Sequence, residues 1–589
     1  MSNNIWVVIE NAENDLTELS KEMMNKAKAI AKTLNKKLVA VVSGYNEEEI
    51  CKKSIAYGAD LVLNCNHKLL KDYTTLPYTK VFNEIIDKYN PYLVIFPASV
   101  NGRDLAGRLC AKKNLGLVAE CSDLKLDGED IKFIRPTFDG KLFSDIRVTT
   151  KPMFATIGHG AFSPAKYDNE NKGEIIEEKV ELTNAEILTE ILKVSTWHKA
   201  TDMFGPIPYK EAGKGLISVP YDSQADVYKY MFEDLTNAIG VLTNALEHGT
   251  TKLLPNADAV YGGNVKKWIV YANSLMLRLA MRVYYADEAM SKKYVLQAVN
   301  NPYGVMQSKD DEAKMEKGAG LTFINNIEIL SNQYNECRMG SSMQAYLGGY
   351  EDPRLPKYFT ESEAYFAKKV GQYGSYMAVP TGNIASQNEV FKMASRPNVT
   401  KTTATYWMRA SEVYFLLAEA ALHGISVNGT AEDLYRKGIA MSFEENGIPA
   451  NEVDNYMNSG RTPMEYSLNM WRPNVSVSEP SVTNATVKWG GSAEEKLEKI
   501  MIQKWIALYP NGQEAWSEYR RTGYPKLHKV MANYSNGEVD TNIGIRRMRY
   551  PANRATSDED KQNLDKARQM LRGGQDKAGT RLWWDNKNK

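Results

Sequence analysis

Cysteine is scarce in this sequence, and neither sign of charge is in excess. The five cysteines include no C-x-x-C pair, so we expect neither a disulfide framework nor a zinc cage. Lys and Arg number 73 against 72 Asp and Glu, which gives no sign of the basic surface that nucleic acid requires. No apolar run approaches the ~20 residues of a membrane-spanning helix.

Motifs of catalysis and metal binding are also missing. The sequence has no H-E-x-x-H, G-x-S-x-G or G-x-G-x-x-G motif, and its six histidines show no paired spacing. The acidic run Asp310-Asp311-Glu312 lacks EF-hand spacing, and a solvated loop explains it better than calcium binding. We therefore expect no catalytic residues, no metal site and no enzyme activity.

Aromatic residues divide the chain into two parts. Of the 10 tryptophans only Trp6 precedes residue 190, and the remainder of the chain is rich in Trp and Tyr. The division predicts a multidomain protein, with an α/β parallel-sheet domain at residues 1–190 and a mainly α domain at 191–589.

The first part alternates short apolar runs with segments of helical spacing. The predicted strands are 5–9, 38–43, 61–63 and 92–97, and the predicted helices are 16–34, 47–57 and 81–89. Strands that alternate with helices at short spacing favour right-handed crossovers and a parallel sheet covered on both faces.

The fourth strand leads into a helix whose amino end would lie at the carboxyl edge of the sheet. One interpretation is an anion or nucleotide site that uses Gly102, Arg103 and Arg108. The alternative, which we favour, is structural: Asn101 caps the helix, Asp104 complements its dipole, and the arginines make domain contacts.

Three runs in this part identify a family. FPASVNGRDLAGRLCAKKNLGLVAECSDL, FIRPTFDGKLFSDI and TTKPMFATIGHGAF closely resemble the amino-terminal domain of the electron transfer flavoprotein alpha subunit, over residues 3–185. The resemblance implies a domain that scaffolds a heterodimer with a beta subunit. FAD in that family lies chiefly on a second, Gly-rich domain, and this sequence does not continue into one. We therefore expect no cofactor in this chain.

The second part carries amphipathic segments with apolar stripes at helical spacing. The predicted helices are 227–246, 265–285, 407–422 and 493–509. Long connections at 301–358 and 457–491 separate them and are expected to be loops. The pattern favours a helical-repeat scaffold with long loop excursions.

A second resemblance covers residues from about 190 to the carboxyl end. TDMFGPIPYKEA, SVPYDSQADVYKYMFEDLTNAI, KWIVYANSLMLRLAMRV, GYEDPRLPKYF, WMRASEVYFLLAEAAL, PNGQEAWSEYRRTGYP and GGQDKAGTRLWWD resemble the SusD/RagB family of Bacteroidetes outer-membrane lipoproteins. The resemblance implies a tetratricopeptide-like fold without catalytic residues. It also implies an oligosaccharide or peptide ligand and a TonB-dependent, SusC-like transporter as partner.

Sugar binding usually relies on flat aromatic rings that stack on the apolar face of a pyranose, while polar side chains hold its hydroxyls, and the loops offer such aromatic residues. The candidate ligand-binding residues are Tyr334, Tyr346, Tyr350, Tyr373, Tyr376, Trp471 and Trp489. Each ring could equally seal the core beneath its loop, and the family motifs assign none of them.

The junction of the two parts has no Pro-, Gly- or Ser-rich linker between Leu182 and Val194. The SusD/RagB family begins with an export signal, a lipid-bearing cysteine and further helices, in whose place the flavoprotein segment stands. The family predicts the cell surface, whereas residues 1–10 have no signal-peptide pattern and predict the cytoplasm. These conflicts suggest a hybrid reading frame, and a hybrid without either activity is a third possibility.

Overall fold

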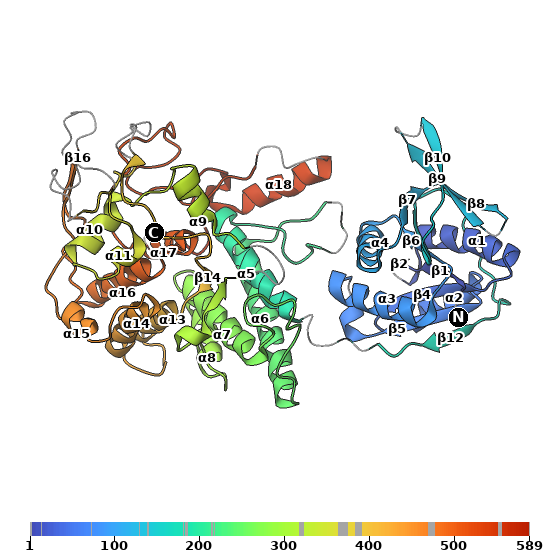
Figure 1. Ribbon diagram of the computed structural model, residues 1–589, viewed down its shortest axis with the longest axis horizontal. Helices are drawn as coiled ribbons and strands as arrows, with labels where there is room; N and C mark the ends of the chain where they lie inside the picture. The colour runs from blue at the N-terminus through green and yellow to red at the C-terminus, as the bar shows by residue number, and fades with distance from the viewer. Residues whose placement is uncertain are drawn as a thin grey trace. The chain divides into compact units, whose positions relative to one another are not determined.

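The protein folds into two compact units in the computed structural model (Figure 1). Unit 1 holds the residues up to 186 together with 211–219, and unit 2 holds 187–210 together with 220–589. The structure describes residues 3–12, 14–71, 73–128, 130–137, 141–180, 182, 187–213, 216, 218–316, 323–362, 375–382, 392–468, 477–551 and 557–587. Unit 1 is an α/β parallel-sheet fold and unit 2 is mainly helical, as the sequence predicts.

Unit 1 is built on a seven-stranded sheet in the order β12-β5-β4-β1-β6-β11-β7, with every pairing parallel. The strands are β1 (Ile5–Val8), β4 (Leu38–Gly44), β5 (Leu61–Asn66), β6 (Leu93–Pro97), β7 (Leu117–Cys121), β11 (Met153–Ile157) and β12 (Glu174–Glu177). In the centre of the sheet, Ile5 lies opposite Leu38 on one side and Leu93 on the other. The chain order reverses at the β1–β6 boundary, as in doubly wound sheets.

Helices cover both faces of this sheet. They are α1 (Glu18–Thr33), α2 (Glu48–Ala56), α3 (Thr75–Tyr89) and α4 (Val100–Lys113). Ile5 and Val7 point into the core that contains residues of α1 and α2. Trp6 and Val8 point into the opposite core, with residues of α3 and α4. Successive strand residues alternate between faces, so one apolar strand serves two cores.

A smaller antiparallel ribbon extends the fold of unit 1. It consists of β8 (Asp123–Asp127), β9 (Asp130–Thr137) and β10 (Leu142–Ile146) in the order β10-β9-β8. A short hairpin of β2 (Asn11–Ala12) and β3 (Asp15–Leu16) precedes α1. The sequence pattern predicted neither element, because two-sided polar strands carry little periodic signal.

Unit 2 is assembled from helices that pack in consecutive pairs, α5 on α6, α6 on α7, α7 on α8, and α13 on α14. The longer helices are α5 (Ile187–Phe204), α6 (Gln224–Glu247), α7 (Val265–Arg282), α8 (Glu288–Val299), α10 (Ser341–Gly349), α13 (Ala410–Leu422), α14 (Ala431–Glu445), α16 (Ala493–Ala507), α17 (Gly512–Thr522) and α18 (Asp558–Met570). No helix in the described part of the chain is long and apolar enough to cross a membrane.

Two predictions for unit 2 are wrong. The helix expected at 407–422 begins only at Ala410, because 405–408 form the strand β14 (Thr405–Met408), which pairs with β13 (Ala313–Met315). The segment 301–358 is not a loop: it contains β13, α10 and the short helices α9 (Asn326–Glu328) and α11 (Leu355–Tyr358). Several of its apolar residues, among them Met306, Met339 and Leu347, are fully buried in the core.

Charged side chains occupy the interior of unit 2. Arg282 and Arg521 are both fully buried. Arg282 pairs with Glu514 and Glu518, and Arg521 holds Glu419 through two contacts of 2.7 Å and Glu518 at 2.6 Å. This network joins α7, α13 and α17. Ion pairs of this kind cost much to break, because removing one partner leaves a charge in the interior.

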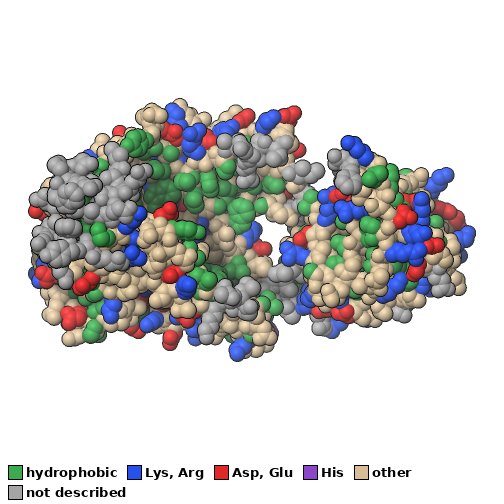
Figure 2. Space-filling model, turned by 45° about the horizontal axis from the view of Figure 1, so that its top comes forward, with side chains coloured by type: hydrophobic (Ala, Val, Ile, Leu, Met, Phe, Trp, Pro, Cys, Tyr) green, Lys and Arg blue, Asp and Glu red, His purple; other side chains and the backbone are tan. Residues whose placement is uncertain are grey.

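Hydrophobic side chains also reach the surface of unit 2. Figure 2 shows them gathered around a hollow on the face that it displays. Exposed large apolar residues of unit 2 include Leu330, Val530, Met531, Ile543 and Ile545. Clustered apolar exposure is typical of binding faces rather than of an inert surface.

Candidate ligand-binding site

The amino end of α4 in unit 1 was the first candidate site. Ser99, not Asn101, caps the helix: its hydroxyl accepts a hydrogen bond of 2.9 Å from the backbone N–H of Gly102. The predicted cap is therefore wrong by two residues. A Cβ on Gly102 would lie 2.1 Å from the carbonyl oxygen of Pro97, so the turn from β6 into α4 needs glycine there.

The two arginines of α4 have carboxylate partners. Arg103 lies 3.2 Å from Glu120, and Nε of Arg108 lies 2.9 Å from Asp104. Asp104 also accepts a hydrogen bond of 2.8 Å from the hydroxyl of Tyr73. These contacts give both arginines carboxylate partners within unit 1, and anion binding there stays a prediction.

Two of the predicted ligand-binding tyrosines lie in the core of unit 2. Tyr346 on α10 is 0% exposed, and Tyr350, the residue that caps its carboxyl end, is 1% exposed. Their hydroxyls donate to the carbonyl oxygens of Lys526 at 2.9 Å and Ala485 at 2.8 Å. The expectation that they contact a ligand has to be corrected, because buried rings with satisfied hydroxyls have no surface to offer.

The other predicted aromatic residues are scattered. Tyr334 is 65% exposed at the end of a π-helical turn, and Tyr376 is partly buried. Trp489 packs on Tyr435 with ring centroids 5.1 Å apart. No ring contact among the described residues joins Tyr334, Tyr376 and Trp489 to one another. Two further candidates, Tyr373 and Trp471, lie outside the described residues.

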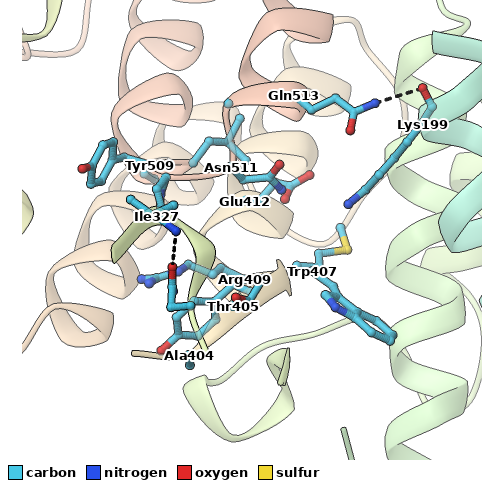
Figure 3. Close-up of a pocket in the computed structure, with 17 residues that line it drawn as sticks. Lys199, Ile327, Ala404, Thr405, Trp407, Arg409, Glu412, Tyr509, Asn511 and Gln513 are labelled. Carbon is cyan, nitrogen blue, oxygen red and sulfur yellow. Dashed lines mark hydrogen bonds between the residues drawn. The ribbon is translucent and has the colours of Figure 1, made fainter. Parts of the chain in front are cut away.

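A cavity of about 350 Å³ in unit 2 brings polar and aromatic residues together (Figure 3). It lies among α5, β14, the start of α13 and the connection between α16 and α17. Its lining residues are Lys199, Asn325, Ile327, Glu412, 404–409 and 507–513. The side chain of Gln513 donates to the carbonyl oxygen of Lys199 at 2.9 Å, and this bond holds α17 against α5.

Three aromatic residues, Tyr406, Trp407 and Tyr509, are among those that line the cavity. Tyr406 and Trp407 come from β14, whose pairing with β13 fixes their backbone. The guanidinium of Arg409 lies 3.8 Å from the ring centroid of Tyr406. Tyr509 packs on Tyr358 with centroids 4.7 Å apart, which holds its ring in place.

Two charged residues at the cavity differ in their partners. Both carboxylate oxygens of Glu412 are held by the buried Arg278, at 2.6 and 2.7 Å. The ammonium group of Lys199 has no partner within the described residues, although its side chain is partly buried. Burial, and then the nearby positive charge of Arg278, lower the pKa of Lys199. Figure 3 shows its side chain extending from α5 into the cavity.

Other chemistry is not indicated in the described residues. No group of three His, Cys, Asp or Glu side chains there could hold a metal ion. The thiols of Cys51, Cys65, Cys110 and Cys121 are free and buried, and burial raises their pKa values. The groups that the cavity offers are rings, amides, a hydroxyl and one unpaired ammonium. Such groups can stack on and hydrogen-bond to a polar molecule.

The family of unit 2 follows from comparison with known proteins. Residues 157–585 match the family model described as SusD and RagB outer membrane lipoprotein. The chain belongs to the SusD/RagB family. Among solved structures, a chitin-binding SusD homologue from Flavobacterium johnsoniae is 36% identical, with a TM-score of 0.63, and the match covers 68% of this chain and 80% of that one. A SusD homologue from Bacteroides thetaiotaomicron is 36% identical over 69% of this chain and 83% of that one, with a TM-score of 0.61.

Unit 1 has a separate match. Residues 5–183 match the electron transfer flavoprotein domain, which confirms the resemblance in the sequence and the two-part character of the chain. The electron transfer flavoprotein subunit alpha of Clostridium acetobutylicum is 33% identical over 195 residues, which are 32% of this chain and 58% of that protein. Protein FixB of Clostridium saccharobutylicum is 35% identical over 32% of this chain and 57% of its own length. The chain thus spans less than two thirds of these curated relatives.

Sequence reasoning missed the cavity of the SusD/RagB unit. A single lysine on an amphipathic helix is normally solvated, so nothing in the α5 segment singles out Lys199. Its partial burial follows from the packing of α17 on α5, residues more than 300 positions apart in the chain. Trp407 was visible in the sequence, but it was assigned to the first turn of a core helix.

Proposed function

We propose that unit 2 binds an oligosaccharide and passes it to a TonB-dependent, SusC-like transporter at the outer membrane. The observation that carries this proposal is the 36% identity to a chitin-binding SusD homologue, over 80% of that chain. Binding without turnover fits the described residues of the cavity, which offer no nucleophile with an adjacent base. The cell-surface location is part of the proposal.

The cavity is the binding site that we favour. Its volume of about 350 Å³ is within the range of small-molecule sites. Sugars are bound by flat aromatic rings against their apolar faces and by amides and charged groups on their hydroxyls. Trp407 and Tyr406 supply the rings, and Asn511 and Gln513 supply amide groups.

Calorimetric titration of the full chain with chito-oligosaccharides, starch fragments and other neutral glycans tests this proposal. For a glycan that binds, Trp407→Ala is expected to weaken affinity by roughly tenfold or more, since a buried aromatic contact carries much of the energy of a site. Trp489→Ala serves as the matched control outside the cavity. If Trp489→Ala abolished binding and Trp407→Ala did not, the site would lie on the loops that the sequence first suggested.

The partner and the location need a second experiment. Affinity purification of the tagged chain from its native host is expected to recover an outer-membrane transporter from the membrane fraction. Recovery of the chain only from the cytoplasm, without a membrane partner, would contradict both parts of the proposal.

Unit 1 supports a second candidate function, as the alpha-subunit partner of an electron transfer flavoprotein beta subunit. The match to the flavoprotein domain over residues 5–183 favours it. Co-expression with a beta subunit from one of the matched clostridial relatives is the test. A stable complex in size-exclusion chromatography with a flavin absorbance band would support it, and a beta subunit that elutes alone would contradict it.

A further inference from the structure

We propose that the cavity of unit 2 is selective for an acidic oligosaccharide, with Lys199 as the residue that binds its carboxylate. This inference rests on the proposed glycan-binding function and specifies its substrate class.

Lys199 is the unpaired charge of the cavity walls. Of the four other charged groups near it, Glu412 and Arg278 are bound to each other by two hydrogen bonds, and Glu514 pairs with Arg282. Arg409 lies over the ring of Tyr406 and 3.6 Å from Glu445. Within the described residues, no hydrogen bond or ion pair joins the ammonium of Lys199 to a carboxylate.

A second cavity of about 220 Å³ shares two lining residues, Lys199 and Trp407, with the first. Its wall also contains His198, which is fully buried and whose Nδ1 lies 2.9 Å from the carbonyl oxygen of Val194. Burial lowers the pKa of His198 to about 3, so this ring is neutral and does not compete for an anion. Lys199 therefore lines two cavities, and the two carboxylates that act on it from a distance, Glu412 and Glu514, are bound to Arg278 and Arg282.

A partly buried ammonium without a partner favours an anionic ligand. Burial has already removed part of its hydration, and a carboxylate would restore the lost interaction as a charge-assisted hydrogen bond. A neutral ligand that filled the cavity would instead leave the ammonium desolvated and unpaired, which costs affinity. A uronic-acid ring combines the required carboxylate with an apolar face for the neighbouring aromatic rings.

The decisive experiment compares two probes by calorimetry on the full chain: trigalacturonate, and its methyl ester, in which methyl groups cap and neutralise the carboxylates. Wild-type protein is expected to bind the acid at least about tenfold more tightly than the ester. Lys199→Met is expected to bind the two equally, and Lys199→Arg to keep the preference. Lys229→Met, an exposed lysine on α6, is the matched control and should behave as wild type.

A second measurement uses only the wild-type protein, so it does not require any variant to fold. The wild-type chain is treated with acetic anhydride, and acetylation of each lysine is followed by mass spectrometry. Lys199 is expected to be acetylated more slowly in the presence of trigalacturonate than in the presence of its methyl ester. Lys229 is expected to react at the same rate in both.

Five results would overturn the inference. Equal binding of acid and ester by wild type, or a preference that survives in Lys199→Met, would remove the role of Lys199. A preference seen only for a tripeptide with a free carboxyl terminus over its amide would assign the carboxylate to a peptide instead. If neutral chito-oligosaccharides bind and the acid has no advantage, the proposed function stands and only this inference fails. If no glycan binds at all, both fail.

Discussion

Two carboxyl groups meet in the interior of unit 2 at the end of the β13–β14 pairing. Glu312 is 3% exposed and Glu445 is 8% exposed. Glu445 accepts hydrogen bonds of 2.7 Å from both the backbone N–H and the hydroxyl of Ser411. No donor from the described residues reaches either oxygen of Glu312. The sequence predicted a solvated loop here, and for Glu312 that prediction is wrong.

The pair predicts a pH dependence of stability. Burial and the adjacent Glu445 raise the pKa of Glu312 from 4.5 to about 8, against the opposing charges of Arg409 and Lys314. The native state thus keeps a proton that the unfolded chain has lost. This stabilisation is complete below pH 4.5 and is lost as the pH rises through about 8. One such proton changes the free energy of unfolding by at most ~1.4 kcal/mol per pH unit.

Glu312→Gln is expected to flatten this dependence and to raise stability at pH values near that pKa. The pH dependence of the unfolding free energy is measured by urea unfolding at several pH values, monitored by tryptophan fluorescence. This signal reports on unit 2, because all tryptophans except Trp6 lie there. Glu247→Gln, at an exposed position on α6, is the control. Parallel pH profiles for wild type and Glu312→Gln would contradict the assignment of the retained proton to Glu312.

Removal of Arg521 is expected to destabilise unit 2 strongly. Its guanidinium is fully buried and binds Glu419 and Glu518, so Arg521→Met leaves carboxylate charge in the interior. Breaking one side of a buried ion network costs about 3–5 kcal/mol. Urea unfolding measures the loss. Arg436→Met breaks an exposed pair with Asp454 and should change stability by less than ~1 kcal/mol; equal losses in the two variants would refute the argument.

At the scale of elements, the helices and strands with strong periodicity could be predicted from sequence. The helix expected at 227–246 is α6, and the buried strands of the unit 1 sheet lie where the apolar runs place them. The failures have local causes. Ser99, not Asn101, caps α4, and residues 407–408, expected at the start of a helix, belong instead to β14, which pairs with β13.

The candidate site could not be predicted in the same way. Its residues come from α5, β14 and the α16–α17 connection, and each is ordinary in its own segment. Only the tertiary packing makes Lys199 a partly buried cation, and the same packing places Tyr346 in the core. Sequence patterns report which face of an element is apolar, but they do not report which distant elements meet.

The contact between α13 and α14 supplies a prediction at this scale. A Cβ on Gly438 of α14 would lie 2.7 Å from the ring of Phe415 on α13, so glycine permits the close approach of the two helices. Gly438→Ala is expected to destabilise unit 2 by roughly 1–3 kcal/mol through overpacking. Gly240→Ala on α6 is the matched control.

At Gly240 nothing lies within 4 Å of the added Cβ, and the position is exposed. The higher helix propensity of alanine should then stabilise the protein by ~0.5–1 kcal/mol. Chemical denaturation of both variants decides the matter. If both substitutions changed stability in the same direction, the close packing of α13 on α14 would not be the reason that position 438 requires glycine.

At the scale of the whole molecule, the described clusters of buried residues each lie within a single unit. The two cores on the faces of the sheet consist of unit 1 residues alone. A separate cluster around Tyr550, Leu564 and Leu571 lies in unit 2, as does the buried ion network. The two family matches, 5–183 and 157–585, divide the chain in nearly the same way, although they overlap at 157–183.

Separate interiors predict separate unfolding transitions. Ile95→Ala removes a fully buried side chain from the sheet of unit 1, and such truncations cost about 2–5 kcal/mol. Scanning calorimetry of the full chain is expected to show two transitions, of which this substitution lowers one by roughly 5–15 °C. Leu275→Ala, equally buried on α7, is expected to lower only the other. A single transition that both substitutions shift would mean that the units fold as one body, and the functions proposed for each unit would then have to be tested as one.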